Sequence, residues 1–359
     1  MPMLNPENRL PNLSTRLSPA DGLALFDVPL LELGMAAQSC CRRRHPGPRR
    51  TFVIGRNLNY TNVCVSGCRF CAFFRGIKSR QAYLLSIDQL LAKIAEMVDV
   101  GGTEVLLQGG LHPVLSITWY QDVFRAVKAA FPSVQLHALS PSEITHLAAR
   151  EALPVADVLA RLQMAGLDSI PGGGAEILVD RVRNTISPRK CSADAWLGVM
   201  REAHRLGLPT TATMMYGHLE TLAERIEHLE RLRALQDETG GFVGFIPWPF
   251  QPGKTPLARQ VAHADDSADA FLRMLAISRL YLDNFPHIQS SWVTQGLKIG
   301  QMGLCFGADD LGSTMMEEQV VSAAGTTFHT NADELARTIA DLGYIPTQRT
   351  TTYTVVREW

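Results

Sequence analysis

Three cysteines stand close together, Cys64, Cys68 and Cys71, in the segment NVCVSGCRFCAFFRG. Three thiolates on a short glycine-containing loop can wrap one corner of an inorganic cluster. Structural zinc normally takes four ligands, often as two separated pairs, and no nearby Cys or His supplies the fourth. The spacing therefore favours a metal cluster with one position open to another molecule, and a zinc site or an incidental group of thiols are the alternatives.

The remaining four cysteines, Cys40, Cys41, Cys191 and Cys305, show no such spacing. They are expected to be buried or free thiols, because cysteine packs as a small hydrophobic residue. The total of seven is odd for a large chain, which argues against a framework of disulfides and for an intracellular protein.

The elements that must position the triad alternate along the chain. Short β-rich runs are separated by amphipathic helical stretches, several of which end at a glycine. The eight expected strands are 51–62, 103–110, 134–141, 169–178, 209–218, 241–250, 288–293 and 304–311. Such alternation predicts an α/β fold, a (β/α)8 TIM-type barrel, whose active site lies at the carboxyl ends of the strands.

The 359 residues, 46% of them hydrophobic and 19% charged, suffice for one large barrel. We expect three parts. Residues 1–50 form a helical extension with one or two helices from Ser18 to near Gln38, residues 51–345 form the barrel, and residues 346–359 form a tail that packs on it.

Charge and hydropathy exclude two classes of partner. Lys and Arg number 34 against 35 Asp and Glu, a balance unlike that of a nucleic-acid-binding protein. The run Arg42 to Arg50 is expected to be a solvated loop, with a site for an anionic partner as the alternative. No apolar run reaches the roughly 18 residues of a membrane helix, and no signal peptide is visible, so we expect a cytoplasmic protein without membrane contact.

The triad, with Phe70 before its last cysteine, resembles the signature of the radical S-adenosylmethionine (SAM) enzymes. The resemblance implies a barrel of the radical SAM kind, in which the three cysteines hold a 4Fe–4S cluster and SAM chelates the fourth iron. It also implies that one electron, from a donor of the flavodoxin or ferredoxin type, cleaves SAM to a 5′-deoxyadenosyl radical that abstracts hydrogen. Phe70 is then expected beside the cofactors.

Three further positions are expected to bind SAM. Gln108-Gly109-Gly110 is similar to the Gly-Gly-Glu motif of the family, although Gly110 replaces the acid, so only the backbone contact is expected. Glu176 follows three glycines and could hold the ribose or ammonium of SAM, or be a solvated acid at a helix start. Ser140 could contact the ligand while it forms a helix capping box with Glu143.

Candidate catalytic groups follow two of the later strands. Tyr216, His218 and Glu220 could orient a polar substrate or move a proton, although a structural role is the alternative. Asp309 is expected at the end of the eighth strand, where it would bind a substrate hydroxyl or act as a base. Asp310 cannot face the same way on a strand.

Longer segments, among them NYTNVC, MMYGHLET and GADDLGSTMMEE, are similar to one branch of the family, the futalosine-pathway and deazaflavin-coenzyme synthases. They are most similar to the cyclic dehypoxanthinyl futalosine synthases of menaquinone biosynthesis. That resemblance implies abstraction of the ribose C4′ hydrogen of dehypoxanthine futalosine, followed by radical addition to its benzoate ring. Aminofutalosine synthase or deazaflavin synthase activity, and a noncatalytic zinc module, are the alternatives.

Overall fold

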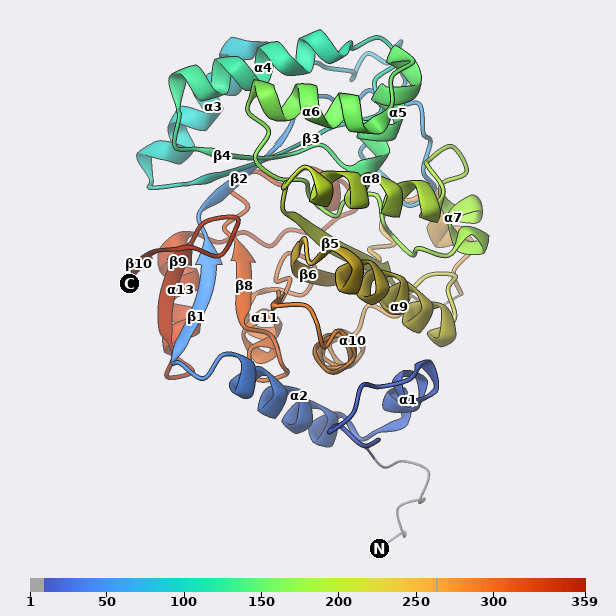
Figure 1. Cartoon of the computed structure of the whole chain (residues 1–359), viewed down its shortest axis with the longest axis vertical. Coiled ribbons are helices and arrows are strands. Elements are labelled where there is room, and N and C mark those ends of the chain that lie inside the picture. The colour runs from blue at the N-terminus through green and yellow to red at the C-terminus, as the bar shows by residue number, and fades with distance from the viewer. Residues whose placement is uncertain (1–9, 263) are drawn as a thin grey trace, which may run out of the picture.

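The computed structural model describes residues 10–262 and 264–359, and a ring of parallel strands forms its centre (Figure 1). The strands of the ring are β1 (Arg49–Val53), β2 (Gly55–Asn59), β3 (Glu104–Gln108), β4 (Gln135–Ala138), β5 (Thr210–Tyr216), β6 (Phe242–Pro249), β7 (His287–Ile288) and β8 (Asp310–Ser313). This arrangement confirms the predicted (β/α)8 TIM-type barrel.

The pairing closes the ring. Strands β1 and β2 run almost without interruption, so that β2 lies beside β3 and β1 lies beside β8. Between β4 and β5, the expected fourth strand is reduced to two parallel bridges, His137 with Ser169 and Ile170 with Thr210. Strands β5, β6 and β7 are consecutive neighbours, and a bridge from Gln289 to Asp310 joins them to β8.

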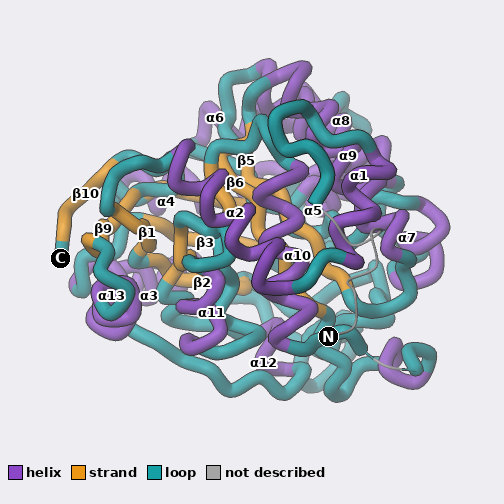
Figure 2. Tube along the Cα trace, turned by 90° about the horizontal axis from the view of Figure 1, so that it is seen from below, coloured by secondary structure: helices purple, strands orange, loops and turns teal. Residues whose placement is uncertain are grey.

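Helices surround the ring (Figures 1 and 2). They are α3 (Ile87–Asp99), α4 (Ile117–Ala130), α5 (Pro141–Glu151), α6 (Val155–Ala165), α7 (Asp180–Ile186), α8 (Ala193–Arg205), α9 (Leu222–Thr239), η2 (Pro256–Arg259), α10 (Ala268–Tyr281), α11 (Leu297–Gly303), α12 (Val320–Ala323) and α13 (Ala332–Ala340). Local signals set several ends: Ser86 and Thr221 form capping boxes, and Gly166 and Gly240 end α6 and α9 with a positive φ.

The N-terminal extension holds α1 (Pro19–Ala24), η1 (Leu25–Asp27) and α2 (Leu30–Arg44). Helix α2 packs against α10 and continues beyond the expected end near Gln38, so the expectation that Arg42 to Arg44 lie in a loop was wrong. Basic side chains suit the last turn of a helix, where they face its negative end. Arg44 also donates to the carbonyl of Phe285 at 2.7 Å.

The C-terminal residues close the amino-terminal end of the barrel. Strand β9 (Ile345–Arg349) pairs in parallel with β1, and β10 (Val355–Glu358) pairs back on β9. The guanidinium of Arg349 forms two hydrogen bonds with Asp310, at 2.6 and 2.8 Å, and the ring of Tyr353 stacks on His287 with centroids 3.5 Å apart. These contacts direct the side chains of Arg349 and Tyr353 into the ring, whereas strand β10 is exposed at the edge of the sheet.

The start of the eighth strand differs from the prediction. Residues 304–306 continue the turn after α11, because their N–H groups donate to the carbonyls of Gln301, Met302 and Gly303. Strand β8 begins only at Asp310. Asp309 and Asp310 therefore lie at the amino end of β8, whereas the active sites of such barrels form at the carboxyl ends of the strands.

A buried histidine makes the stability of this fold dependent on pH. The side chain of His228 on α9 is fully buried, and its Nδ1 accepts a hydrogen bond from the Leu178 N–H at 2.9 Å. Burial and the charge of Arg183 lower the pKa of His228 to about 3. Only the unfolded chain binds this proton below a pH of about 6.5, so the free energy of unfolding decreases by about 1.4 kcal/mol per pH unit from this group as pH falls.

We expect His228→Gln to reduce this pH dependence. Gln keeps an acceptor for the Leu178 N–H but does not titrate. Urea unfolding of both proteins at pH 7.5 and pH 5.5 measures the difference. Equal slopes of unfolding free energy against pH in the two proteins would contradict the assignment.

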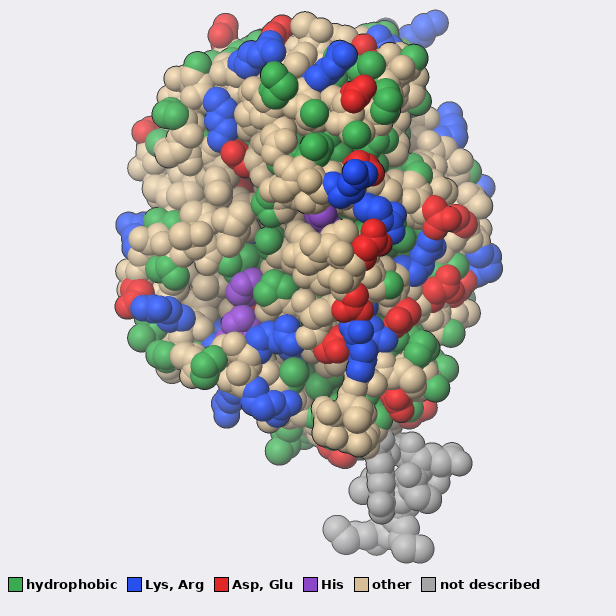
Figure 3. All heavy atoms as spheres, viewed as in Figure 1, with side chains coloured by type: hydrophobic (Ala, Val, Ile, Leu, Met, Phe, Trp, Pro, Cys, Tyr) green, Lys and Arg blue, Asp and Glu red, His purple; other side chains and the backbone are tan. Residues whose placement is uncertain are grey.

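The surface is mixed in character. On the face shown in Figure 3, basic and acidic side chains intermingle. Several form ion pairs, such as Arg201 with Glu238 at 2.6 Å. Within the described ranges, no helix is both long enough and apolar enough to cross a membrane.

Candidate active site

The three cysteines of the triad lie on a loop at the carboxyl end of β2. Backbone bonds hold this loop to its surroundings: the Cys64 N–H donates to the Arg75 carbonyl at 3.0 Å, and the Val65 N–H donates to the Leu111 carbonyl at 3.0 Å. Gly67 turns the loop with a φ of +61°. All three cysteines line one cavity of about 380 Å³ that continues into the barrel.

The three sulfurs of the triad do not all lie within 4.8 Å of one another. Tetrahedral zinc at a Zn–S distance of about 2.3 Å requires sulfurs only about 3.8 Å apart. Across the described part of the chain, no trio of possible ligand atoms within 4.8 Å of one another includes Cys64, Cys68 or Cys71. A cluster needs the wider separation, because each thiolate binds a different iron. The separation of the three sulfurs is therefore wider than a single tetrahedral zinc ion requires.

A buried carboxylate fixes the glycine motif beside the triad. Glu143 accepts hydrogen bonds from the Gly109 N–H and the Tyr60 hydroxyl, both at 2.9 Å, and forms the expected capping box with Ser140. Gly110 approaches the loop so closely that a Cβ there would lie 2.2 Å from the Val63 carbonyl oxygen. Glycine is therefore required at this position by contact with backbone atoms.

Glu176 is buried and is therefore not a solvated acid. It is only 5% exposed, it precedes α7 by several residues, and its φ of +44° is unusual for a side chain with a Cβ. Its Oε1 accepts from Lys190 at 2.8 Å. Its Oε2 lies 3.7 Å from the guanidinium of Arg183 and is buried without a hydrogen-bond partner among the described residues. A buried acceptor of this kind is costly unless a ligand satisfies it.

The six residues expected near SAM all line the cavity: Phe70, Gln108, Gly109, Gly110, Ser140 and Glu176. Phe70 also contacts Lys190, whose ammonium lies 5.2 Å from the ring centroid. The structure therefore brings these residues together with the triad around one space.

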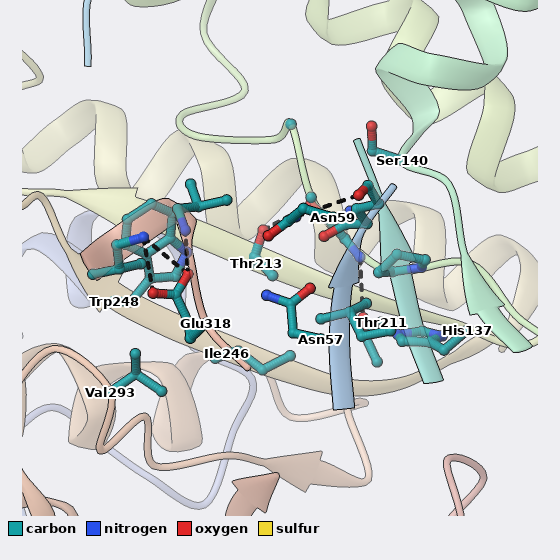
Figure 4. Close-up of a pocket in the computed structure, with 18 of the residues that line it drawn as sticks. Asn57, Asn59, His137, Ser140, Thr211, Thr213, Ile246, Trp248, Val293 and Glu318 are labelled. Atoms are coloured by element: carbon teal, nitrogen blue, oxygen red, sulfur yellow. Dashed lines mark hydrogen bonds between the residues drawn. The ribbon is translucent and has the colours of Figure 1, made fainter. Parts of the chain in front are cut away.

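The barrel interior below the triad carries polar side chains that motif reasoning missed. Figure 4 shows Asn57, His137, Thr211 and Thr213 directed into the same space from β2, β4 and β5. Burial, with a smaller effect from Arg349, lowers the pKa of His137 to about 3, so this imidazole is neutral at pH 7. Oδ1 of Asn57 is buried without a partner in the described chain. Strict alternation of side chains along each strand would have identified these positions.

The expected trio after β5 lies outside the cavity. Thr211 and Thr213 face inward, so Tyr216 faces the helices, where the guanidinium of Arg225 lies 4.9 Å from its ring centroid. Glu220 accepts from Arg225 at 2.8 Å and from the Gly217 N–H at 2.6 Å, and lies 3.1 Å from the imidazole of His218. The side chains of His218 and Glu220 are fully buried. Tyr216, His218 and Glu220 therefore stabilise the loop that follows β5. This position, outside the cavity, does not agree with the expected catalytic role.

Asp309 also lies away from the cavity. Its carboxylate accepts from the Ile288 N–H at 2.9 Å and from His287 at 2.5 Å, and it is paired with Arg279. His45 of the N-terminal extension is 3.5 Å away. This network joins the extension to the barrel, so the expectation that Asp309 meets a substrate does not agree with its position.

The sequence is similar to those of known proteins along almost its whole length. The radical SAM superfamily model matches residues 58–232, and the model of the CofH/MqnC C-terminal region matches residues 239–359. The cyclic dehypoxanthine futalosine synthase of Halalkalibacterium halodurans is 45% identical over 345 residues, covering 95% of this chain and 92% of that protein. The chain belongs to the radical SAM superfamily. It is an enzyme, and it binds a 4Fe–4S cluster and SAM as members of this family do.

Relatives with other names are nearly as similar. The aminodeoxyfutalosine synthase of Thermus thermophilus is 44% identical over 347 residues, covering 96% of this chain and 93% of that protein. A 5-amino-6-(D-ribitylamino)uracil–L-tyrosine 4-hydroxyphenyl transferase of Methanosarcina barkeri is 41% identical, covering 94% and 90%. Methylornithine synthase (PylB) shares the fold, with a TM-score of 0.73 at 15% identity over 93% of this chain and 95% of that one.

Proposed function

We propose that this radical SAM enzyme cyclises dehypoxanthine futalosine to cyclic dehypoxanthinyl futalosine in menaquinone biosynthesis. The observation that carries the proposal is the 45% identity to a synthase of that name over nearly the whole of both chains. The cavity supports it, because one continuous space joins the three thiols to a barrel interior lined with polar groups, among them Asn57, Thr211 and Thr213. Such an interior suits a ribose linked to an aromatic ring.

Each part of the site has a proposed role. Cys64, Cys68 and Cys71 would hold the cluster. The backbone of Gly109 and Gly110 would approach the amino group of SAM, and Oε2 of Glu176, which has no hydrogen bond in the described chain, would accept from the ribose or ammonium. Phe70, Gln108 and Ser140 complete the walls of the SAM site.

The chemistry is a hydrogen abstraction followed by ring closure. Cluster and SAM, when bound, supply a 5′-deoxyadenosyl radical. The substrate gives up the C4′ hydrogen, which leaves as part of 5′-deoxyadenosine, and the ribosyl radical adds to the benzoate ring. To regain its aromaticity, the ring would then give up one electron, for which the oxidised cluster would be the acceptor, and one proton, which a base or solvent would take.

The residues of the barrel interior position the substrate and protect the radical. Leu106, Ile246 and Trp248 form apolar walls that exclude water. Thr211 and Thr213 offer hydroxyl groups that can orient the sugar, so that C4′ stays within van der Waals reach of the radical carbon. Neutral His137 adds a hydrogen-bonding group without a charge.

Anaerobic incubation of the reduced enzyme with SAM and three candidate substrates tests the proposal. We expect dehypoxanthine futalosine to give a cyclised product and free 5′-deoxyadenosine, detected by mass spectrometry. An adenosylated product from the enolpyruvyl ether would instead identify an aminodeoxyfutalosine synthase. A hydroxyphenyl adduct of the ribitylaminouracil with tyrosine would identify the transferase. Either of the last two results, with dehypoxanthine futalosine unchanged, would overturn the proposal.

A further inference from the structure

Two histidines and an aspartate from three parts of the chain meet at the amino-terminal end of the barrel. His45 directly follows α2 of the N-terminal extension, His287 begins β7, and Asp309 directly precedes β8. One nitrogen or oxygen atom of each side chain lies within 4.8 Å of the other two. Residues 10–262 and 264–359 contain no second group of three His, Cys, Asp or Glu side chains with this property. We call these residues the His–His–Asp group.

The three side chains offer the donors of a transition-metal site. Imidazole nitrogen and carboxylate oxygen are common ligands of Zn²⁺ and similar divalent ions, and three protein ligands with one water complete a tetrahedral site. Zinc–ligand bonds of about 2.0 Å place neighbouring donor atoms about 3.3 Å apart. Nε2 of His45 lies 3.5 Å from Oδ2 of Asp309, which is close to this spacing.

The other contacts of the two imidazoles are hydrogen bonds that an ion would replace. Nδ1 of His287 lies 2.5 Å from Oδ2 of Asp309, and Nε2 of His45 lies 2.9 Å from the Pro286 carbonyl. Each imidazole can move its proton to the other ring nitrogen and so present a lone pair to the ion without changing its charge. His287 would also have to move away from Asp309 by about 0.8 Å to reach the tetrahedral spacing.

The surroundings of Asp309 orient its carboxylate toward the histidines. Oδ1 is paired with Arg279 and accepts from the Ile288 N–H at 2.9 Å, which leaves Oδ2 for the two imidazoles. The ring of Tyr353, stacked on His287, limits the rotation of that imidazole. Such outer contacts hold the ligands of metal sites in position.

Charge and exposure decide how strongly an ion would bind. The positive charge of Arg279 offsets the negative charge of Asp309, so we expect micromolar affinity and not the tighter binding of a permanent structural zinc. The side chains of His45 and His287 are 23% and 21% exposed, which gives an ion a path to the group and leaves room for a water ligand. The arrangement therefore suits an exchangeable ion.

We propose that His45, His287 and Asp309 bind one divalent transition ion of the Zn²⁺ type, which links the N-terminal extension to the barrel. None of the three side chains lines the cavity, so this site is separate from the cluster and from SAM. Because α2 ends at Arg44, a ligand at the next residue holds the end of this helix against β7 and β8. The ion thus acts on the stability of the extension, whichever substrate the enzyme takes.

Zinc titration of the cluster-loaded enzyme tests the proposal without a measurement of turnover. The loaded enzyme is used because its triad thiols are already occupied, and a chelating resin first removes loosely bound metal. Anaerobic isothermal titration calorimetry should show one Zn²⁺ bound per chain. Zn²⁺ should also raise the urea concentration at half-unfolding, since a ligand that binds only the folded state stabilises it. Hydrogen–deuterium exchange should become slower at the end of α2.

Substitution of a ligand locates the bound ion. His45→Gln removes one imidazole and leaves the hydrogen bond between His287 and Asp309 in place. We expect Zn²⁺ to bind this variant about a hundredfold more weakly or less, since loss of even an outer partner of a ligand costs about 10–100-fold. His287→Gln, tested in the same way, should show the same loss.

His329→Gln is the matched control, because His329 is exposed and outside the His–His–Asp group, and it should keep the full affinity. Equal Zn²⁺ affinity in His45→Gln and the unmodified enzyme would overturn the proposal. A titration without Zn²⁺ uptake would overturn it as well, and so would one in which Zn²⁺ only displaces iron from the triad, seen as loss of the cluster absorption. Failure of the cyclisation assay would refute the proposed function and leave this site unaffected.

Discussion

The Cys68→Ala variant, reconstituted anaerobically, is expected to bind little iron and to release no detectable 5′-deoxyadenosine. Cys68 is 3% exposed and lies on a loop whose backbone is held on both sides, so the loop is not free to bring another thiolate into its place. With two thiolates left, we expect about tenfold less cluster than in the unmodified enzyme. Iron content, the absorption spectrum and the electron paramagnetic resonance signal of the reduced protein measure this directly.

Cys305→Ala is the matched control. Cys305 is a free, partly exposed thiol at the turn after α11, outside the cavity. The control should keep the full iron content and activity. Unchanged iron binding in Cys68→Ala would show that the triad does not hold the cluster, and the assignment of the whole site would then be wrong.

The Asp309→Asn variant is expected to have a lower free energy of unfolding than the unmodified enzyme, while the folded variant still releases 5′-deoxyadenosine. Asp309 is the negative partner of Arg279, and both side chains are almost completely buried. Burial alone would raise the pKa of Asp309, but Arg279 and the hydrogen bond from His287 outweigh it and hold that pKa well below its usual range. Removing one partner of a buried ion pair costs about 3–5 kcal/mol, because the remaining charge is uncompensated.

Unfolding in urea at pH 7.5 measures this loss, and 5′-deoxyadenosine release by folded protein measures the chemistry. Asp283→Asn is the control, since Asp283 is 42% exposed in its pair with Arg16 and should contribute less than about 1 kcal/mol. A variant of normal stability with lost turnover would contradict the structural role and restore the catalytic one. The ionised Asp309 stabilises the fold above the unfolded-state pKa near 4, so this contribution disappears as the pH falls below it.

Local signals in the sequence predicted the parts of the site that depend on local structure. The triad, the two glycines after β3 and the capping box of Ser140 with Glu143 each lie within a few residues, and each was found in the expected place. The barrel itself was predictable for a similar reason, because alternation of strands and helices is repeated along the chain.

The errors arose where a boundary or a distant contact decides the result. Asp309 was misplaced because residues 304–306 form a turn, although Leu-Cys-Phe has the composition of a strand. The prediction for Tyr216 was wrong because side chains on β5 alternate between the cavity and the helices. A shift of one residue in the alternation reverses the side that Tyr216 faces. No local pattern in the sequence predicts the ion pair of Arg349 with Asp310, because the two residues belong to segments that are distant in the sequence.

The position of the C-terminal segment has a consequence for biosynthesis. Strand β1 emerges from the ribosome early, yet its neighbour β9 and the side chains of Arg349 and Tyr353 that fill the barrel are among the last residues made. The core of the barrel therefore stays incomplete until translation ends. During most of that time the nascent chain exposes apolar surface that can aggregate. The loop of the triad, by contrast, is complete within the first quarter of the chain, long before the scaffold that shelters it from oxygen.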